Sequence, residues 1–133
     1  MNPIHEHFLR DYFAARNGIE LVDVSPGYAK VRMTVDPMLH YNAVGTVHGG
    51  AIFTLADFAF AVASNSHGTV AMGINVSISY LKAVTEGELV AEAREAVLGP
   101  RLASYRVDVT DSAGDIVALF QGMVYRKQDK LDF

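Results

Sequence analysis

The 133-residue sequence has no cysteine and no tryptophan. Without cysteine there can be no disulfide bond, no thiolate metal site and no cysteine nucleophile. The sequence also lacks a run of about 18 apolar residues, the length that a membrane-spanning helix requires, so we expect no membrane partner. Residues 1–8 are not typical of a secretory signal, and we therefore expect a cytoplasmic protein.

Positive charge is also scarce. The chain has 11 Lys and Arg residues against 15 Asp and Glu residues, a net charge of −4, and its basic residues are scattered. This distribution argues against a nucleic-acid partner. Hydrophobic residues make up 50% of the chain. We expect a single domain over residues 1–133 that buries part of its apolar surface against another subunit.

The hydrophobic period changes twice in the first part of the chain. Apolar residues at helical spacing predict an amphipathic helix over residues 3–16, within an N-terminal segment 1–17 that ends before Gly18. We expect its apolar face to dock on the body of the domain. Residues 19–24 and 28–35, with a three-residue turn between them, predict a β-hairpin. Residues 36–50 follow neither period and are predicted to form a loop.

The remaining chain predicts one buried helix and four strands. Residues 50–64 are almost continuously apolar and rich in alanine, which favours a central helix buried on nearly every side. Turn residues then separate four strand-like runs at 70–80, 88–98, 102–110 and 116–126. The order predicts an α+β fold in which an antiparallel sheet curls around a central helix, with a short helix at the N-terminus.

Asp57 is the informative residue of the predicted central helix, because an ionised carboxylate is not placed in an apolar core without a partner or a purpose. Thr54, Asp57 and Ser64 fall roughly on one stripe of the helix, with Gly50 at its head. We expect this stripe to face a crevice rather than the core.

The helix is entered through His48, Gly49 and Gly50, and the exposed N–H groups of such a helix start can bind an oxyanion. Gly50 and Asp57 are seven residues apart, about 10 Å along one helix. Both would have to approach the same reacting centre within about 3 Å. A two-fold dimer that sets Gly50 of one subunit against Asp57 of the other removes this difficulty.

The segment from Asn42 to Asp57 contains the pattern Asn-x₂-Gly-x₂-His-Gly-Gly, with an aspartate seven residues after the last glycine. It closely resembles the signature of hot-dog-fold acyl-CoA thioesterases of the PaaI-like branch, named for phenylacetic acid degradation. Further segments at 59–66, 105–109 and 117–122 continue the resemblance, which extends from about residue 18 to residue 126.

The resemblance implies hydrolysis of an acyl-CoA to the acid and coenzyme A, so that coenzyme A is part of the substrate and no cofactor is needed. It implies Asp57 as the catalytic carboxylate, either general base or nucleophile, and the Gly50 N–H as oxyanion donor. Asn42 and His48 correspond to residues that position the thioester and the attacking water. The family also implies a homodimer with a continuous sheet, usually paired into a tetramer. The acyl group stays open between aryl-acetyl, hydroxylated aromatic and medium-chain groups.

Five further residues are candidates for substrate binding: Gly49, Thr54, Gly73, Asn75 and Arg101. Gly73 stands where some relatives carry a serine that orients water, so Asn75, Ser77 or a partner chain would have to supply that help. Relatives commonly carry a Gly-Arg or Gly-Lys pair before the next strand, and Pro100 interrupts this pair here. We therefore expect the contacts of Arg101 with the nucleotide end of coenzyme A to differ from those in relatives.

Other readings compete with these assignments. Asp57 could be a structural carboxylate, Asn42 a turn residue, and His48 a bridge between loop and helix. Asp36 and His40 could be the pair of an acyl-CoA hydratase, although their spacing differs from that group's. A non-catalytic acyl-CoA-binding protein is the third possibility.

The remaining aromatic and imidazole side chains predict little chemistry. His5, His7, His40 and His67 lack metal-ligand spacing, so no metal is expected. Phe53, Phe58 and Phe60 are interpreted as core residues, although at least one of them could also line an acyl pocket.

Overall fold

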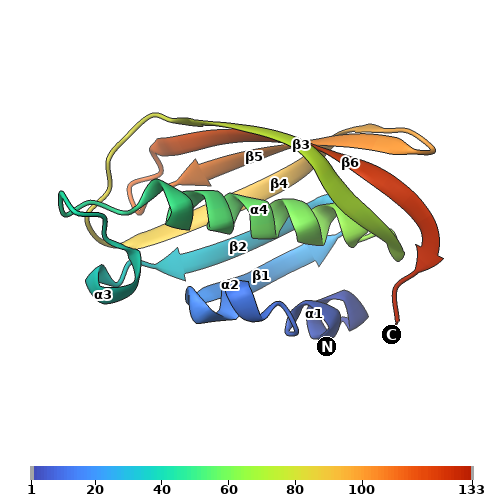
Figure 1. Cartoon of the computed structure of the whole chain (residues 1–133), viewed down its shortest axis with the longest axis horizontal. Coiled ribbons are helices and arrows are strands. Elements are labelled where there is room, and N and C mark those ends of the chain that lie inside the picture. Colours follow the sequence, from blue (N-terminus) through green and yellow to red (C-terminus); the bar gives the residue numbers. More distant parts are fainter. Residues whose placement is uncertain (1, 133) are drawn as a thin grey trace.

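The fold is an antiparallel sheet wrapped around one long helix (Figure 1). The computed structural model describes residues 2–132. Strands β1 (Ile19–Ser25), β2 (Tyr28–Thr34), β3 (Thr69–Tyr80), β4 (Glu88–Leu98), β5 (Leu102–Thr110) and β6 (Ile116–Lys130) pair in the order β1-β2-β4-β5-β6-β3. The predicted α+β architecture and all six predicted strands are confirmed, and the last strand continues four residues beyond its predicted end at 126.

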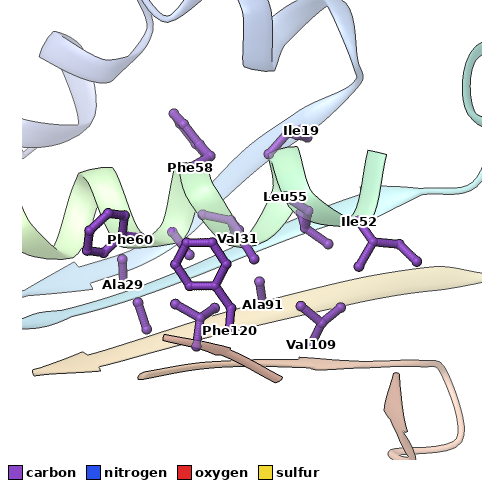
Figure 2. Packing of buried hydrophobic residues seen from close by; sticks show 14 of the residues in the cluster. Ile19, Ala29, Val31, Ile52, Leu55, Phe58, Phe60, Ala91, Val109 and Phe120 are labelled. Atoms are coloured by element: carbon purple, nitrogen blue, oxygen red, sulfur yellow. The ribbon is translucent and has the colours of Figure 1, made fainter. Parts of the chain in front are cut away.

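Helix α4 (Gly49–Asn65) is the predicted central helix, extended by one residue at each end. It lies across the concave face of the sheet in Figure 1. Small residues on the sheet, such as Ala29 and Ala91, let it approach closely, while Leu55 and Val31 fill the space between them (Figure 2). No helix within residues 2–132 is long and apolar enough to cross a membrane.

Glycines on the sheet admit Phe60, one of the three phenylalanines of this helix. A Cβ on Gly122 would lie 2.7 Å from the ring of Phe60, and one on Gly73 would lie 3.1 Å from it. The Phe60 ring also packs against Tyr105 and Phe120. Glycine is therefore required at position 122 by packing and not by backbone conformation.

The predicted N-terminal helix over 3–16 is wrong in one respect, because the chain forms two short helices, α1 (Pro3–Phe8) and α2 (Tyr12–Arg16). Asp11 interrupts the helix with a non-helical backbone, and its side chain accepts a hydrogen bond from the Ala14 N–H, which begins α2. Phe8 packs on Phe58 of α4 as expected, but Phe13 is 66% exposed.

The predicted loop over 36–50 contains a further short helix, α3 (Pro37–His40). Asp36 accepts a hydrogen bond from the Met38 N–H, and Pro37 occupies the first helical position. This is a recognisable start signal for a helix. The glycines that follow this signal nevertheless favoured the prediction of a loop.

Candidate functional site

Asp57 lies at the middle of α4 and lines a cleft of about 520 Å³ between α4 and the short helices α2 and α3. Gly50 and Thr54 of α4 and His48 line the same cleft, so four of the predicted site residues are brought together. Ser64 is not among them. It is 2% exposed and donates to the Ala61 carbonyl, so the predicted stripe faces the cleft only in its first half.

The Asp57 carboxylate makes no hydrogen bond or ion pair with any residue in the described range 2–132. Burial raises its pKa above the ordinary aspartate value, and the negative charge of Asp11 raises it further. A half-buried carboxylate without a structural partner is the arrangement expected of a reactive group. The structural reading of Asp57 as an ion-pair partner therefore has no partner to support it within that range.

The start of α4 holds His48 in a defined state. The Gly50 N–H donates to Nδ1 of His48 over 2.8 Å, so a neutral His48 ring carries its proton on Nε2. Thr54 turns its hydroxyl back to the Gly50 carbonyl at 2.7 Å. The Gly50 N–H, predicted to bind an oxyanion, is thus already bonded to His48.

Gly49, one residue earlier, differs from Gly50 in this respect. Its carbonyl accepts a hydrogen bond from the Tyr80 hydroxyl at 3.0 Å, whereas its N–H donates to no group within residues 2–132. The first N–H of a helix has no intrahelical partner. Gly49 therefore presents an uncommitted backbone donor at the start of α4, next to Gly50, which lines the cleft, although Gly49 itself does not line it.

Asn42 does not line the cleft. Its amide group donates to the Thr46 hydroxyl at 2.8 Å, and its carbonyl oxygen accepts from the N–H groups of Val44 and Thr46. These bonds close the turn that contains Gly45 at positive φ. These are the bonds of a turn residue, which was the competing reading of Asn42 in the sequence.

Gly73, Asn75 and Arg101 lie apart from the cleft of their own chain. Gly73 and Asn75 are on β3, the outer strand of the sheet. Arg101 is exposed in the turn between β4 and β5, where its carbonyl accepts the Arg126 N–H. Within one chain none of these three residues lines the cleft at Asp57.

The second wall of the cleft was missed by sequence reasoning. It is built by Phe13 and Asn17 at α2, and by Leu39 and Tyr41 at α3. Phe53 lines the cleft and also packs edge-on against Phe120, so it is the helix aromatic that serves both roles. The apolar residues of the N-terminal segment were the available signal for this wall, but their helical spacing predicted that they dock on the core.

Asp36 and His40 are not placed as a hydratase pair. His40 is 1% exposed, with Nδ1 bonded to the Asp36 N–H and Nε2 to the Asn17 carbonyl. The Asp36 carboxylate caps α3. Neither group faces the cleft, so the hydratase reading loses its chemistry. Within residues 2–132, no three His, Asp or Glu side chains are grouped so that they could hold a metal ion.

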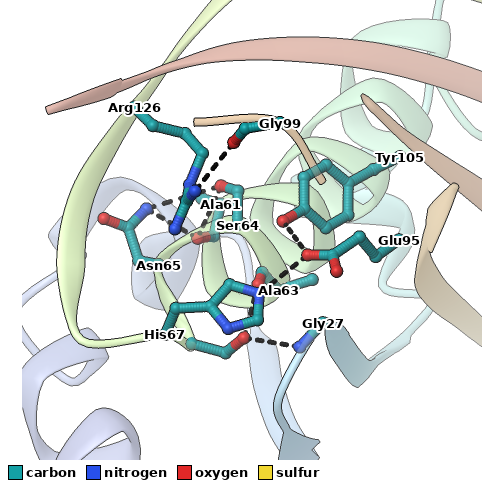
Figure 3. Close-up of polar contacts among 11 residues, drawn as sticks. Gly27, Ala61, Ala63, Ser64, Asn65, His67, Glu95, Gly99, Tyr105 and Arg126 are labelled. Carbon is teal, nitrogen blue, oxygen red and sulfur yellow. Dashed lines mark hydrogen bonds and ion pairs between the residues drawn. The ribbon is translucent and has the colours of Figure 1, made fainter. Parts of the chain in front are cut away.

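A second polar cluster lies at the other end of α4 (Figure 3). Glu95 accepts hydrogen bonds from the Tyr105 hydroxyl at 2.6 Å and is paired with His67 Nε2 at 2.7 Å. Burial alone would raise the pKa of Glu95, but the hydrogen bonds from Tyr105 and His67 lower it below its usual value. Burial and the bond to Glu95 raise the pKa of Tyr105. Every one of these groups has a partner.

Comparison with known proteins agrees with this geometry. Residues 44–118 match the Thioesterase superfamily. The chain is 53% identical over 107 residues to a provisionally named esterase of Archaeoglobus fulgidus, covering 80% of this chain and 69% of that protein. It is 33% identical to acyl-coenzyme A thioesterase PaaI of Escherichia coli, covering 92% of this chain and 87% of that one.

The structure is also similar to that of the E. coli PaaI protein from the phenylacetic acid degradation operon. The TM-score is 0.91 at 31% sequence identity, and the match covers 96% of this chain and 93% of the other. The predicted hot-dog fold is thereby confirmed. The chain belongs to the thioesterase superfamily and is a thioester hydrolase of its PaaI-like, acyl-CoA thioesterase branch.

Proposed function

We propose that the chain hydrolyses an acyl-CoA thioester in the cleft at Asp57, with Asp57 as general base or nucleophile. The observation that carries this proposal is the state of Asp57, a half-buried carboxylate with a raised pKa and no partner among residues 2–132, in a cleft that Gly50 at the start of α4 also lines. A raised pKa makes the carboxylate a better proton acceptor near neutral pH.

Two routes lead from this arrangement to the same products. As a base, Asp57 takes a proton from water while the water oxygen bonds to the thioester carbon. As a nucleophile, it forms a mixed anhydride that water then opens. In both routes the carbon–sulfur bond breaks, and coenzyme A leaves as a thiolate that takes up a proton. The remaining product is the carboxylic acid.

The oxyanion formed on the thioester oxygen needs backbone donors at the start of α4. Gly50 is the donor that the family resemblance implies, but its N–H is bonded to His48 and would bind an oxyanion only after that ring moves. We propose the uncommitted Gly49 N–H as the first donor and the Gly50 N–H as the second. His48 Nε2–H, on the cleft wall, would assist by orienting the attacking water.

We also propose that the enzyme is a homodimer joined through β3. Both edge strands have register shifts in their pairing, but β1 also carries the charged residues Glu20 and Asp23, as protected edges do. Strand β3 has neither charge nor proline over its 12 residues. It exposes the hydrophobic side chains of Met72, Ile74, Val76 and Tyr80.

Pairing of β3 with its two-fold copy would extend the sheet through both subunits and bring Gly73 and Asn75 to the interface. The spacing of Gly50 and Asp57 along α4 supports a site shared between subunits, and two such dimers would form the predicted tetramer. Arg101 remains a proposed contact for the coenzyme A phosphates, since a few local cations must hold them on an acidic chain.

The assembly is tested by sedimentation of the purified protein. We expect a dimer or larger species, and a lone 14.4 kDa monomer at micromolar concentration would contradict the proposal. A Val76→Lys variant on β3 should dissociate and lose activity, whereas Val22→Lys on the β1 edge should do neither. The two valines are matched, with exposed fractions of 38% and 43%.

The function is tested by a hydrolysis screen over a panel of acyl-CoAs, in which release of the free thiol of coenzyme A is measured. The panel should include phenylacetyl-CoA, a hydroxylated benzoyl-CoA, octanoyl-CoA and acetyl-CoA, because aryl-acetyl and hydroxylated aromatic groups are the proposed substrates. We expect thiol release dependent on Asp57. Hydration of an enoyl-CoA without thiol release would support the hydratase reading, and binding without any turnover would support the non-catalytic one.

A further inference from the structure

The second wall of the cleft is formed by two helices that are too short to be stable alone. Helix α2 has five residues and α3 has four, and isolated helices of this length do not persist in water. Their position opposite Asp57 therefore depends on tertiary bonds. Phe13 of α2 contributes the one aromatic ring of this wall that is largely exposed, at 66%.

A continuous series of hydrogen bonds holds Phe13 in place. The Asn17 side chain donates to the Phe13 carbonyl at 2.9 Å, and the Asn17 carbonyl is bonded to Nε2 of His40 at 2.7 Å. The Asp36 N–H donates to Nδ1 of the same ring at 2.9 Å. These bonds join residues far apart in the sequence into one wall.

The bonds of His40 define its tautomer. Because the Asp36 N–H can only donate, Nδ1 must accept, and because the Asn17 carbonyl can only accept, Nε2 must carry the proton. The neutral ring satisfies both partners in a fully buried position. The His40 carbonyl also accepts the His48 N–H at 2.6 Å, so the same residue joins the wall to the start of α4.

The chemistry of the cleft limits what this wall can contact. Asp57 is the only charged side chain that lines the cleft among the described residues, and Asp11 adds negative charge nearby. A carboxylated acyl group would be repelled. Aromatic rings lie on both walls of the cleft. Phe53 of α4 packs against Phe120, and Phe13 of α2 lies on the opposite wall. An uncharged, flat acyl group fits this surface best.

We propose that Phe13 determines acyl specificity by packing against an uncharged aromatic acyl group, and that His40 is the positioning residue that holds Phe13 through Asn17. This inference rests on the proposed function, since it places the acyl group in the cleft at Asp57. It makes the N-terminal segment an element of substrate recognition and not only a cover for the core.

The test compares Phe13→Ala with Tyr12→Ala. Tyr12 is the matched control, since it lies on the same helix with the same 66% exposure but does not line the cleft. The readout is the ratio of kcat/KM for phenylacetyl-CoA to that for acetyl-CoA. Phe13→Ala should lower this ratio about two- to tenfold, as expected for loss of an aromatic contact. Tyr12→Ala should leave the ratio unchanged.

Two variants of His40 test the positioning role. In His40→Gln the amide can still donate to the Asn17 carbonyl, whereas in His40→Asn the shorter side chain keeps only the bond to the Asp36 N–H. We expect the Asn variant to lower the ratio as Phe13→Ala does, and the Gln variant to restore most of it. A loss confined to thermal stability, equal in both variants, would overturn the positioning role.

Binding measurements separate this inference from the proposed function. Calorimetry with the non-hydrolysable thioether phenacyl-CoA, compared with coenzyme A alone, reports the acyl contact without turnover. Weaker binding of the thioether by Phe13→Ala, with coenzyme A binding unchanged, would support the inference even if no thioester were hydrolysed. Unchanged thioether binding would overturn it, as would dissociation of the Phe13→Ala oligomer with the specificity ratio preserved.

Discussion

The middle and the C-terminal end of helix α4 carry polar residues in opposite circumstances. At the C-terminal end Asn65 donates to the Ala61 and Ala71 carbonyls and accepts the Ala71 N–H. Ser66 donates to the Ala63 carbonyl while it accepts the Gly27 N–H. Asp57, in contrast, has no such bonds to any described residue.

Among the described residues every fully buried side-chain polar atom is paired, whereas the half-buried carboxylate of Asp57 is open to the cleft and unpaired. The cluster of Glu95, Tyr105 and His67 fixes the loops at the C-terminal end of α4 and needs no substrate to complete it. The carboxylate of Asp57 and the N–H of Gly49 are left for a ligand. This difference predicts that substitutions near Asp57 affect turnover, whereas substitutions near Glu95 affect stability.

The largest effect is expected for Asp57→Asn. Asparagine keeps the size of the side chain but can neither attack nor take a proton, so turnover should fall about 10²–10⁴-fold. Single-turnover hydrolysis of the best substrate measures this. Asp57→Glu restores the charge about one methylene further out, and partial activity would favour a base that acts through water over a nucleophile.

The stability of Asp57→Asn distinguishes the middle of the helix from its C-terminal end further. Because folding raises the pKa of Asp57, its ionised form costs stability above that raised pKa, and the cost disappears as pH falls through it. The variant should therefore melt no lower than the wild type at pH 7, and any advantage should vanish in acid. A structural ion pair would instead give a loss of about 3–5 kcal/mol.

The next largest effect is expected at the start of α4. Removal or crowding of one oxyanion donor typically costs about 10²–10³ in rate. A Cβ at Gly49 would lie 3.2 Å from the Tyr80 ring, and one at Gly50 would lie 3.0 Å from His48 Nδ1. We expect Gly49→Ala to reduce kcat more than Gly50→Ala, with little change in melting temperature. The reverse order would return the first donor to Gly50.

A smaller effect, on stability alone, is expected for Glu95→Gln. The variant loses a charged acceptor shared by Tyr105 and His67, which should cost about 1–3 kcal/mol in denaturant unfolding. Since the pKa of Glu95 is lowered by folding, its contribution is present above the unfolded pKa and is lost as pH falls through the folded one. The gap between the two proteins should therefore close in acid. A loss of turnover at full stability would remove the contrast between Asp57 and the cluster at the C-terminal end of α4.

Much of the fold could be predicted from local patterns. Strands were recognised from alternation and turn residues, and α4 from its continuous apolar run. The break at Asp11 was missed because an N-cap residue lies within an amphipathic pattern that continues on both sides of it. The strand order, which places β3 at an edge, is not encoded in any local period.

A site residue could be predicted where its side chain differs in polarity from its sequence neighbours. It could not be predicted where its place in the site depends on residues far away in the sequence. Asp57 was recognised because a charge interrupts an apolar helix. Phe13 was not, because its place in the cleft depends on the bond between His40 and Asn17, which are 23 residues apart. Asn42 was assigned from its motif, whereas its hydrogen bonds are those of a turn.

The smallest expected effect concerns Asp11, whose negative charge acts on Asp57 from the N-terminal segment. Burial is the larger cause of the raised pKa of Asp57, and the charge of Asp11 adds to it. Asparagine caps a helix as well as aspartate does, so Asp11→Asn should keep the bond from the Ala14 N–H and the start of α2. Without the charge the pKa of Asp57 should fall, and the acid limb of the kcat/KM profile, where Asp57 becomes protonated, should move to lower pH.

Salt and a second variant control this prediction. Salt screens exposed charges, so about 1 M salt should move the wild-type limb toward that of the variant and leave the variant's own limb nearly in place. Glu6→Gln, which removes a charge from α1, should leave the limb unmoved. An acid limb that stays in place in Asp11→Asn, at low and high salt alike, would mean that Asp57 does not sense the N-terminal segment.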